Sequence, residues 1–387
     1  RVMRHLPVGV MDEQLLGWLD EAVGPGRMTG ASLRLFGPLE DFPFDGGSGL
    51  FDLRSRLAPL AFRFRPDWPG FEAVDAELRF RNRGMTVSAD SARIAGVSLR
   101  DATASVADLW TPRLRIDGSF RGALQAMQDF LVRSPLLADS SALQALSWQG
   151  DGDLDLALYF PFQQQPLQVD GRLQLDGARL ASAAMPLALD DIRGALRFDE
   201  QGVAWDGLRA RFAGRPVISR ASTRGEGRDA RIEVIADARL GVEDWPGLGG
   251  LADRATGVSA WRLRWQRPGF AVSSGLQVPQ RLTLRSALEG VALDLPLALG
   301  KAAGTRAPLA LDWSGQADGG SSWRLAYDER LELRMATSGT GERRAALHFG
   351  AGSPALPAAP ITRLTGRLPR LDLAAAGTGP MGTEGAA

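Results

Sequence analysis

Residues 30–64 read GASLRLFGPLEDFPFDGGSGLFDLRSRLAPLAFRF, and this stretch holds the pattern that decides the fold. A short alternation of apolar and polar residues at Leu33 and Leu35 ends at a Gly-Pro pair. After the segment DFPF and a glycine-rich turn, a second alternation runs on to Phe62 and Phe64. A period of two is typical of a β-strand with one buried and one solvent-exposed face. The stretch therefore predicts a strand, a turn and another strand.

The same period continues through most of the chain, with Gly, Pro, Asn or Asp soon after each apolar pair. Apolar residues at strand parity include Leu78, Phe80, Leu154, Leu156, Leu158, Phe160, Leu173, Leu175, Leu196 and Phe198. The close spacing predicts about twenty short strands with antiparallel neighbours rather than βαβ units. A mainly β chain of this kind forms stacked β-sandwiches, a β-solenoid, or one long, twisted antiparallel sheet curled about its apolar face.

A few segments have helical spacing instead. They are residues 11–23, residues 122–131, a second short helix through Leu143 and Leu146, and a short helix within 244–255. The expected organisation is an N-terminal helical cap (1–29), a first β segment (30–120), a helical insertion (121–149), a second β segment (150–375) and a disordered tail (376–387).

Composition excludes several classes of protein. Lys plus Arg equals Asp plus Glu at 45 each, so no net charge attracts nucleic acid, and no nucleic-acid partner is expected. The absence of cysteine excludes disulfides and thiolate chemistry. No apolar run is long enough for a membrane-spanning helix, and the chain begins without a signal peptide, as expected for a piece of a longer protein.

No residue pattern indicates catalysis, and we expect no enzyme activity, no cofactor and no metal. The two histidines, His5 and His348, lack metal-ligand spacing, and His348 is expected on the solvent-exposed face of a strand. Acidic pairs such as Asp153 and Asp155 fit the polar face of a strand better than a glycosidase site. The ten tryptophans lack a shared period, which favours anchoring at strand ends over a carbohydrate platform.

A set of short motifs resembles, in order, the large conserved region of YhdP-like proteins of the AsmA superfamily. The motifs are HLP (5–7), LGWLD (16–20), GPLEDFPF (37–44), GLF (49–51), WP (68–69), FLVRSPL (130–136), GALRF (194–198), GLRARFAGRP (207–216), LEGVALDLPL (288–297), GK (300–301), RAALHFG (344–350) and GRLPRLDL (366–373). They cover nearly the whole chain.

The resemblance implies a bacterial envelope protein, similar to TamB, that is periplasmic and tethered to the inner membrane through an anchor outside this chain. It implies a long β-sheet curled into an elongated hydrophobic groove that carries phospholipid acyl chains between the inner and outer membranes. The groove lining would be Leu33, Leu35, Phe62, Phe64, Leu78, Phe80, Leu154, Leu156, Leu158, Phe160, Leu173, Leu175, Leu196 and Phe198. The partner on the outer-membrane side stays open.

Two other interpretations stay open at this point. The first is an envelope scaffold of closed β-sandwiches without lipid, because a sandwich core and a groove lining follow the same period. The second is an elongated polysaccharide-acting enzyme, which would need a tight cluster of carboxylates in a cleft.

Overall fold

The computed structural model describes residues 17, 21–22, 24, 27–63, 69–133, 144–161, 167–182, 187–245, 248–270, 279–296 and 298–367. The chain divides into two compact units, unit 1 (Arg1–Leu208) and unit 2 (Arg209–Ala387). Of the 22 described strands, 20 belong to one sheet, and two short strands of unit 2 form a second sheet. The predicted mainly β fold with one large sheet is confirmed.

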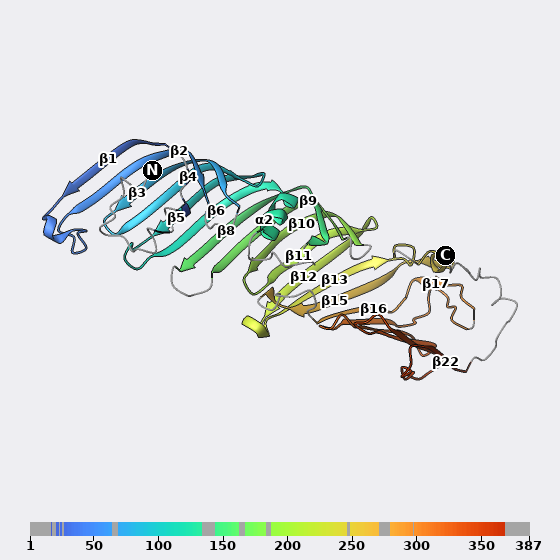
Figure 1. The fold of residues 1–387 in the computed structure, drawn as a ribbon. Helices are drawn as coiled ribbons and strands as arrows, with labels where there is room; N and C mark the ends of the chain where they lie inside the picture. The colour runs from blue at the N-terminus through green and yellow to red at the C-terminus, as the bar shows by residue number, and fades with distance from the viewer. Residues whose placement is uncertain are drawn as a thin grey trace, which may run out of the picture. The chain divides into compact units, whose positions relative to one another are not determined.

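Unit 1 is an antiparallel sheet in which sequence neighbours pair from β1 to β6, followed by β6 with β8, β8 with β9 and β9 with β10 (Figure 1). The short β7 pairs with the far end of β9. Its elements are β1 (Met28–Phe36), η3 (Leu39–Asp41), β2 (Leu50–Phe62), β3 (Phe71–Arg81), β4 (Gly84–Ile94), β5 (Val97–Val106), β6 (Arg113–Ala123), α2 (Leu124–Arg133), β7 (Leu146–Gln149), β8 (Asp151–Pro161), β9 (Gln168–Ser182) and β10 (Leu187–Asp199). Strand β11 (Val203–Phe212) includes the division between the units.

Unit 2 continues in the same manner, with antiparallel pairs from β12 through β13, β15, β16, β18, β19 and β20 to β21. Its elements are β12 (Arg215–Arg224), η4 (Gly227–Asp229), β13 (Arg231–Leu240), α4 (Gly249–Ala252), β14 (Ala255–Gly257), β15 (Ser259–Pro268), β16 (Gln280–Ser286), β17 (Val291–Leu293), β18 (Leu309–Gly315), β19 (Ser321–Tyr327), β20 (Leu331–Thr337), β21 (Arg343–Phe349) and β22 (Thr362–Gly366). Strands β14 and β17 form the separate two-stranded sheet.

Short turns explain why neighbours in sequence become neighbours in the sheet. Strands β4 and β5 are joined by Ala95 and Gly96, both with positive φ, and Ile94 pairs with Val97 across the turn. Two consecutive positive φ values define a hairpin turn whose twist matches that of the flanking strands. The chain therefore folds back at once, and each strand places its apolar residues beside those of the previous strand.

One strand pair departs from the expected antiparallel pattern. Strand β22 runs parallel to β21, with Leu364 beside Leu347. Residues 350–361 connect the two strands, and a connection of that length can return to the start of the sheet edge, as a parallel pair requires. The prediction of a purely antiparallel sheet is therefore wrong at this edge.

The helical predictions have mixed outcomes. Helix α2 forms within the expected segment, with Leu124 and Met127 buried. The second short helix is wrong at its C-terminal end, because Leu146 belongs to strand β7 and pairs with Ser182; Leu143 lies outside the described residues. Within 244–255 only the four-residue α4 is present in the described part. The helix expected at 11–23 falls almost entirely outside the described residues, as do Phe64 and the tail 376–387.

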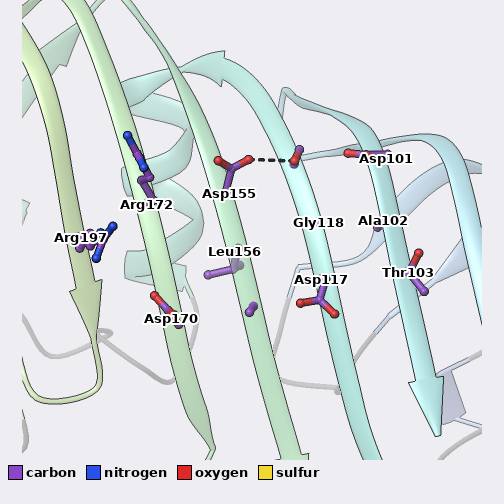
Figure 2. Close-up of a pocket in the computed structure, with 12 residues that line it drawn as sticks. Asp101, Ala102, Thr103, Asp117, Gly118, Asp155, Leu156, Asp170, Arg172 and Arg197 are labelled. Atoms are coloured by element: carbon purple, nitrogen blue, oxygen red, sulfur yellow. Dashed lines mark hydrogen bonds between the residues drawn. The ribbon is translucent and has the colours of Figure 1, made fainter.

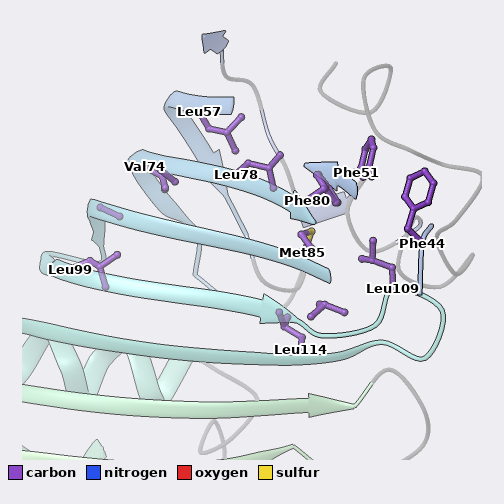
Figure 3. Close-up of a cluster of buried hydrophobic side chains, with 13 residues drawn as sticks. Phe44, Phe51, Leu57, Val74, Leu78, Phe80, Met85, Leu99, Leu109 and Leu114 are labelled. Carbon is purple, nitrogen blue, oxygen red and sulfur yellow. The ribbon is translucent and has the colours of Figure 1, made fainter. Parts of the chain in front are cut away.

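Each unit has one cluster of buried apolar side chains. In unit 1 the cluster joins residues of β2 to β6 with Leu109 and with Phe44 from the DFPF segment, as Figure 3 shows. Phe44 is 1% exposed and lies edge-on to Phe42, which in turn contacts Phe51. In unit 2 the cluster joins residues of β13, β15, β16 and β19 with the β14–β17 sheet.

Candidate functional site

The apolar residues of unit 1 share one face of the sheet, because the register places them opposite one another. Leu78 pairs with Val87 and Phe80 with Met85. The alignment continues strand by strand, with the pairs Met85–Val106, Val106–Leu114, Leu114–Phe160, Ile116–Leu158, Phe120–Leu154 and Leu154–Leu173, and finally Leu173–Leu196. Paired residues of antiparallel strands point to the same side. This surface, from β1 to β10, is called the apolar face of unit 1.

The predicted lining residues fall on this face with different degrees of burial. Leu33 and Leu35 pair with Leu53 and Phe51 and are about half exposed. Four residues are buried, namely Leu78, Phe80, Leu158 and Leu175. Six are half-buried, namely Leu154, Leu156, Phe160, Leu173, Leu196 and Phe198. Phe62 is also half-buried and packs against the buried cluster and beside Phe71.

Burial on the apolar face differs from strand to strand. Several apolar residues of β3 and β4, such as Phe80 and Met85, are at most a few per cent exposed. On β8 to β10 many residues of the same parity, such as Leu156 and Leu196, remain half-buried. The face is therefore a packed core around β3 and β4 and a partly solvent-accessible apolar wall over β8 to β10.

One row of the apolar face is made mostly of small residues. It runs across the strands as Ala76, Ala89, Ala102, Gly118, Leu156 and Gly171. A Cβ at Gly171 would lie 2.2 Å from the ring of Phe198, so glycine is needed for the ring to cover the backbone there. A Cβ at Gly118 would lie 3.1 Å from the ring of Phe120, which is tight but less restrictive.

Helix α2 packs on the apolar face near the ends of β8 and β9. A Cβ at Gly152 would lie 2.7 Å from Leu124 and 3.0 Å from Leu173, so both side chains lie directly over that glycine. Gln128 donates to the carbonyl oxygen of Leu146 at 2.9 Å and ties the helix to β7. The helix thus covers one end of the face and leaves the half-buried leucines farther along β8 uncovered by these contacts.

The opposite face of unit 1 carries the charges. Asp52, which is 5% exposed, accepts two hydrogen bonds of 2.9 Å from Arg79 and further ones from Arg54. The hydrogen bonds from Arg79, aided by Arg54, hold the pKa of Asp52 well below its ordinary value. The carboxylate is therefore ionised at neutral pH and joins β2 to β3 on this side.

A hollow of about 530 Å³ lies on the charged face, over β5 to β10 (Figure 2). Asp101, Asp155 and Asp170 line it together with Arg172 and Arg197, and all five side chains are exposed. Asp155 accepts a hydrogen bond of 2.8 Å from Ser119. Within the described residues no three acidic or histidine side chains are close enough together to hold a metal ion. The carboxylates stand exposed in an open hollow, which differs from the closed apolar pocket that surrounds the acid of a glycosidase.

Unit 2 also has an apolar face, and its rows are more regular. A row of leucines crosses the strands as Leu263, Leu284, Leu311, Leu325, Leu333 and Leu347. The neighbouring row carries aromatic residues and runs as Trp265, Leu282, Trp313, Trp323 and Met335. Sequence reading assigned the tryptophans to strand ends without a common row, and the register corrects this for three of them.

The charged face of unit 2 also holds a buried carboxylate. Glu332 is 6% exposed and binds Arg324 and Arg334 at 2.8 Å, and it accepts a hydrogen bond of 2.6 Å from Ser353. These contacts, with Arg324 first, lower the pKa of Glu332 to about 2. His348 lies opposite Glu332 on β21 and contacts Thr365, on the charged face as expected.

Lys301, the only lysine of the chain, is a buried cation without a carboxylate partner among the described residues. Its Nζ donates to the carbonyl oxygens of Leu288 and Val291, and burial lowers its pKa. Because the ammonium closes a loop onto strand β17, its role is to hold the β14–β17 sheet in place. It faces backbone carbonyls rather than a cavity.

Sequence reading missed Arg267, which stands at apolar parity on β15. The signal was present, because Leu263, Trp265 and Arg267 alternate with charged or polar residues. No helix in the described part of the chain has both the length and the apolar character needed to cross a bilayer.

The fold and the two-faced sheet define a class of protein with an extended apolar face and no described catalytic cluster. The family model described as "YhdP protein" matches residues 1–376, and the chain belongs to this family. It is 25% identical over 313 residues to the "Intermembrane phospholipid transporter YhdP" of Escherichia coli (strain K12). That alignment covers 80% of this chain and 24% of the relative, so the chain spans about a quarter of the relative's length. No solved structure matches.

Proposed function

We propose that this chain is a segment of a bridge-like lipid transporter whose apolar face shields phospholipid acyl chains. The observation that carries the proposal is the continuous register of apolar residues from β1 to β10, with many residues half-buried over β8 to β10. Membership of the YhdP family and the printed name of the relative support phospholipid as the cargo.

The energetics favour such a wall as a transport path. Moving an acyl chain from a bilayer into water costs about 0.8 kcal/mol of free energy for each CH₂. A chain of roughly 16 carbons therefore meets a barrier on the order of 12 kcal/mol. A surface of Leu, Ile, Val and Phe replaces hydrocarbon by hydrocarbon at each step, which makes movement along it nearly neutral. No cofactor and no catalytic residue is needed for that process.

The location follows from the same proposal. The segment works in the periplasm, between the inner and outer membranes, as part of a protein that is tethered to the inner membrane. The alternative of a scaffold built from closed β-sandwiches needs two facing sheets. The described strands of unit 1 all belong to one sheet, which favours the lipid path.

A charge on the apolar face tests the proposal. Leu156 lies between Gly118 and Gly171 in the row of small residues, so an aspartate there has room. Leu156→Asp is expected to lower phospholipid transfer between donor and acceptor vesicles at least tenfold. Tyr159→Asp, on the opposite face of the same strand and beside Arg115, is the matched control and should transfer lipid like the wild type.

Two results would contradict the proposal. Wild-type protein that purifies without phospholipid and fails to transfer a labelled phospholipid between vesicles has no lipid path. Equal loss of transfer in Leu156→Asp and Tyr159→Asp points to general disruption of β8. Thermal unfolding of both variants shows whether the sheet is intact, since each side chain is at least partly in contact with solvent.

A further inference from the structure

The apolar face of unit 2 changes character towards one rim. The leucine row is followed by the row that contains Trp265, Trp313 and Trp323. The next position outward on β15 is Arg267, at the end of the strand. Tryptophan combines an apolar ring with a polar N–H and favours boundaries between apolar and aqueous surroundings. The order leucine, tryptophan, arginine therefore runs from an apolar interior to a polar edge.

The opposite end of the same face is closed. Trp261, Leu284 and Tyr327 pack with Val291 and Leu293 of the β14–β17 sheet in the buried cluster of unit 2. Trp265, Trp313 and Trp323 are not part of that cluster, and Trp323 is 36% exposed. A ligand that enters the face of unit 2 from solvent accordingly meets the tryptophan rim.

Arg267 is a cation on the apolar side of the sheet without an acidic partner in the described part of the chain. It shares its face with Ile232, which lies opposite it on β13. Its Nε donates to the carbonyl oxygen of Pro268 at 3.1 Å, and no described acceptor binds its two terminal nitrogens. Burial lowers the pKa of the guanidinium, which nevertheless stays charged at neutral pH.

The neighbouring arginines of β15 behave differently. Arg262 binds Asp237 at 2.7 Å and Arg264 lies 3.5 Å from Glu233, and both stand on the charged face. An unpaired charge in a half-buried position is unfavourable unless another group satisfies it. The contrast within one strand marks Arg267 as a cation without a counter-charge among the residues that the structure describes.

Two side chains complete the rim beside Arg267. Its guanidinium lies over the ring of Trp265, 5.9 Å from the ring centre. Arg281 pairs with Gln266, so Gln280, one residue earlier, lies opposite Arg267 on the apolar side. Gln280 accepts a hydrogen bond of 3.1 Å from the Trp265 indole through its Oε1, which leaves the amide NH₂ available as a donor.

We propose that Arg267, together with Gln280, binds the phosphate of a phospholipid headgroup at the rim of unit 2. The proposal rests on the proposed function, because it assumes that acyl chains lie on the half-buried residues of the leucine row, such as Leu325 and Leu333. A guanidinium offers two parallel N–H groups that match two phosphate oxygens, and a partly desolvated site strengthens these bonds. The phosphate then lies at Arg267 at the strand end, and the acyl chains lie on the tryptophan and leucine rows.

Lipids with matched chains test the proposal. Binding of dioctanoyl phosphatidylglycerol and of dioctanoylglycerol, which lacks the phosphate, is measured for the wild type, Arg267→Gln and Arg267→Lys. Arg267→Gln is expected to weaken binding of the phosphatidylglycerol about tenfold and to leave dioctanoylglycerol unchanged. Arg267→Lys should recover part of the affinity, because lysine keeps the charge but not the paired donors.

Arg262→Gln is the matched control, because Arg262 lies on the same strand but on the charged face, and it should bind both lipids like the wild type. A titration with inorganic phosphate followed by ³¹P NMR separates a lipid headgroup from a free anion. At millimolar inorganic phosphate we expect the wild type and Arg267→Gln to give the same spectra, because free phosphate does not bind at Arg267.

Three outcomes would overturn the headgroup site. If Arg267→Gln weakens binding of both lipids equally, Arg267 serves the packing of the protein and not phosphate binding. If binding of phosphatidylglycerol is unchanged, Arg267 does not contact the phosphate. Binding of inorganic phosphate that requires Arg267 and is as tight as that of the lipid assigns the site to a free anion. Failure of the proposed function has a separate signature, since the wild type would then bind neither lipid.

Discussion

Units 1 and 2 use the same period-two pattern but build different walls with it. Strands β1 to β6 and β8 to β10 contain no tryptophan, and one row of their apolar face is mostly alanine and glycine. The corresponding face of unit 2 has leucine in one row from β15 to β21, and the next row has tryptophan on β15, β18 and β19. The alternation of residues thus sets which face is apolar, whereas the volume of the side chains sets how far each row projects from the sheet.

The charged faces of the two units are more alike. Each holds one buried carboxylate between two arginines, Asp52 in unit 1 and Glu332 in unit 2. A carboxylate that joins arginines of its own and a neighbouring strand fixes strand register from the solvent side. The two units therefore share a way of aligning strands and differ in what the aligned strands present to a ligand.

The largest effect is expected from removing the charge of Asp52, which tests whether the buried carboxylate aligns the strands of unit 1. Asp52→Asn leaves Arg79 and Arg54 without their counter-charge and should lower the free energy of unfolding by about 2 kcal/mol, since solvent near the arginines screens part of the interaction. Urea unfolding gives the magnitude. Hydrogen exchange should speed up in β1 to β3 and stay unchanged in β18 to β21; equal acceleration in both units would contradict separate alignment.

Glu332→Gln is the counterpart in unit 2, with an expected loss of about 1 kcal/mol at pH 7, because the amide oxygen can still accept hydrogen bonds from Ser353 and Arg334. The folded-state pKa is lowered from 4.5 to about 2. The contribution of Glu332 is therefore fully present above pH 4.5 and is lost as the pH falls towards 2. Unfolding measured across this window should show a shallower pH dependence for Glu332→Gln than for the wild type.

Filling the row of small residues tests the difference between the walls. Gly118→Leu places a side chain against Phe120 and Ala102 and raises unit 1 to the height of the leucine row of unit 2. We expect phospholipid transfer between vesicles to fall about fivefold, as an acyl chain loses contact along that row. Ser119→Leu, on the opposite face of the same strand, is the control. Unchanged transfer by Gly118→Leu would show that the small residues serve packing alone.

The smallest effect is expected at the tryptophan row. Trp323→Phe should change stability by less than about 1 kcal/mol, because the side chain is exposed at its edge. Phospholipid brominated near the middle of its acyl chains quenches indoles in contact with it. The variant should lose a small part of the quenching seen in the wild type, whereas Trp110→Phe, in an exposed turn of unit 1, should lose none.

Much of this arrangement is readable from sequence where side chains are large. The run from Leu154 to Phe160 alternates cleanly and forms β8, and the predicted lining residues that the structure describes share one face. Strand β4 is rich in Ser and Ala and shows no clear alternation of apolar and polar residues, because small residues are common in both strands and loops. Its place follows only from the neighbours that pair with it.

Pairing partners and isolated charges were harder to predict. The parallel pair β21–β22 depends on the path of residues 350–361, which have no periodic pattern. Arg267 occupies an apolar position by parity, yet arginine near the end of a strand is common and is usually solvated. Only the register, which places Ile232 and Gln280 on either side of it, shows that the cation belongs to the apolar side.

The strict register has an evolutionary consequence. Loss of one residue within a strand turns every following side chain to the opposite face, so that Leu156 and Leu158 would exchange places with Asp155 and Ala157. Such a deletion would interrupt the apolar wall and the charged face at once. Relatives of this chain are therefore expected to differ in length at their turns, such as Ala95–Gly96, and to keep the spacing inside each strand.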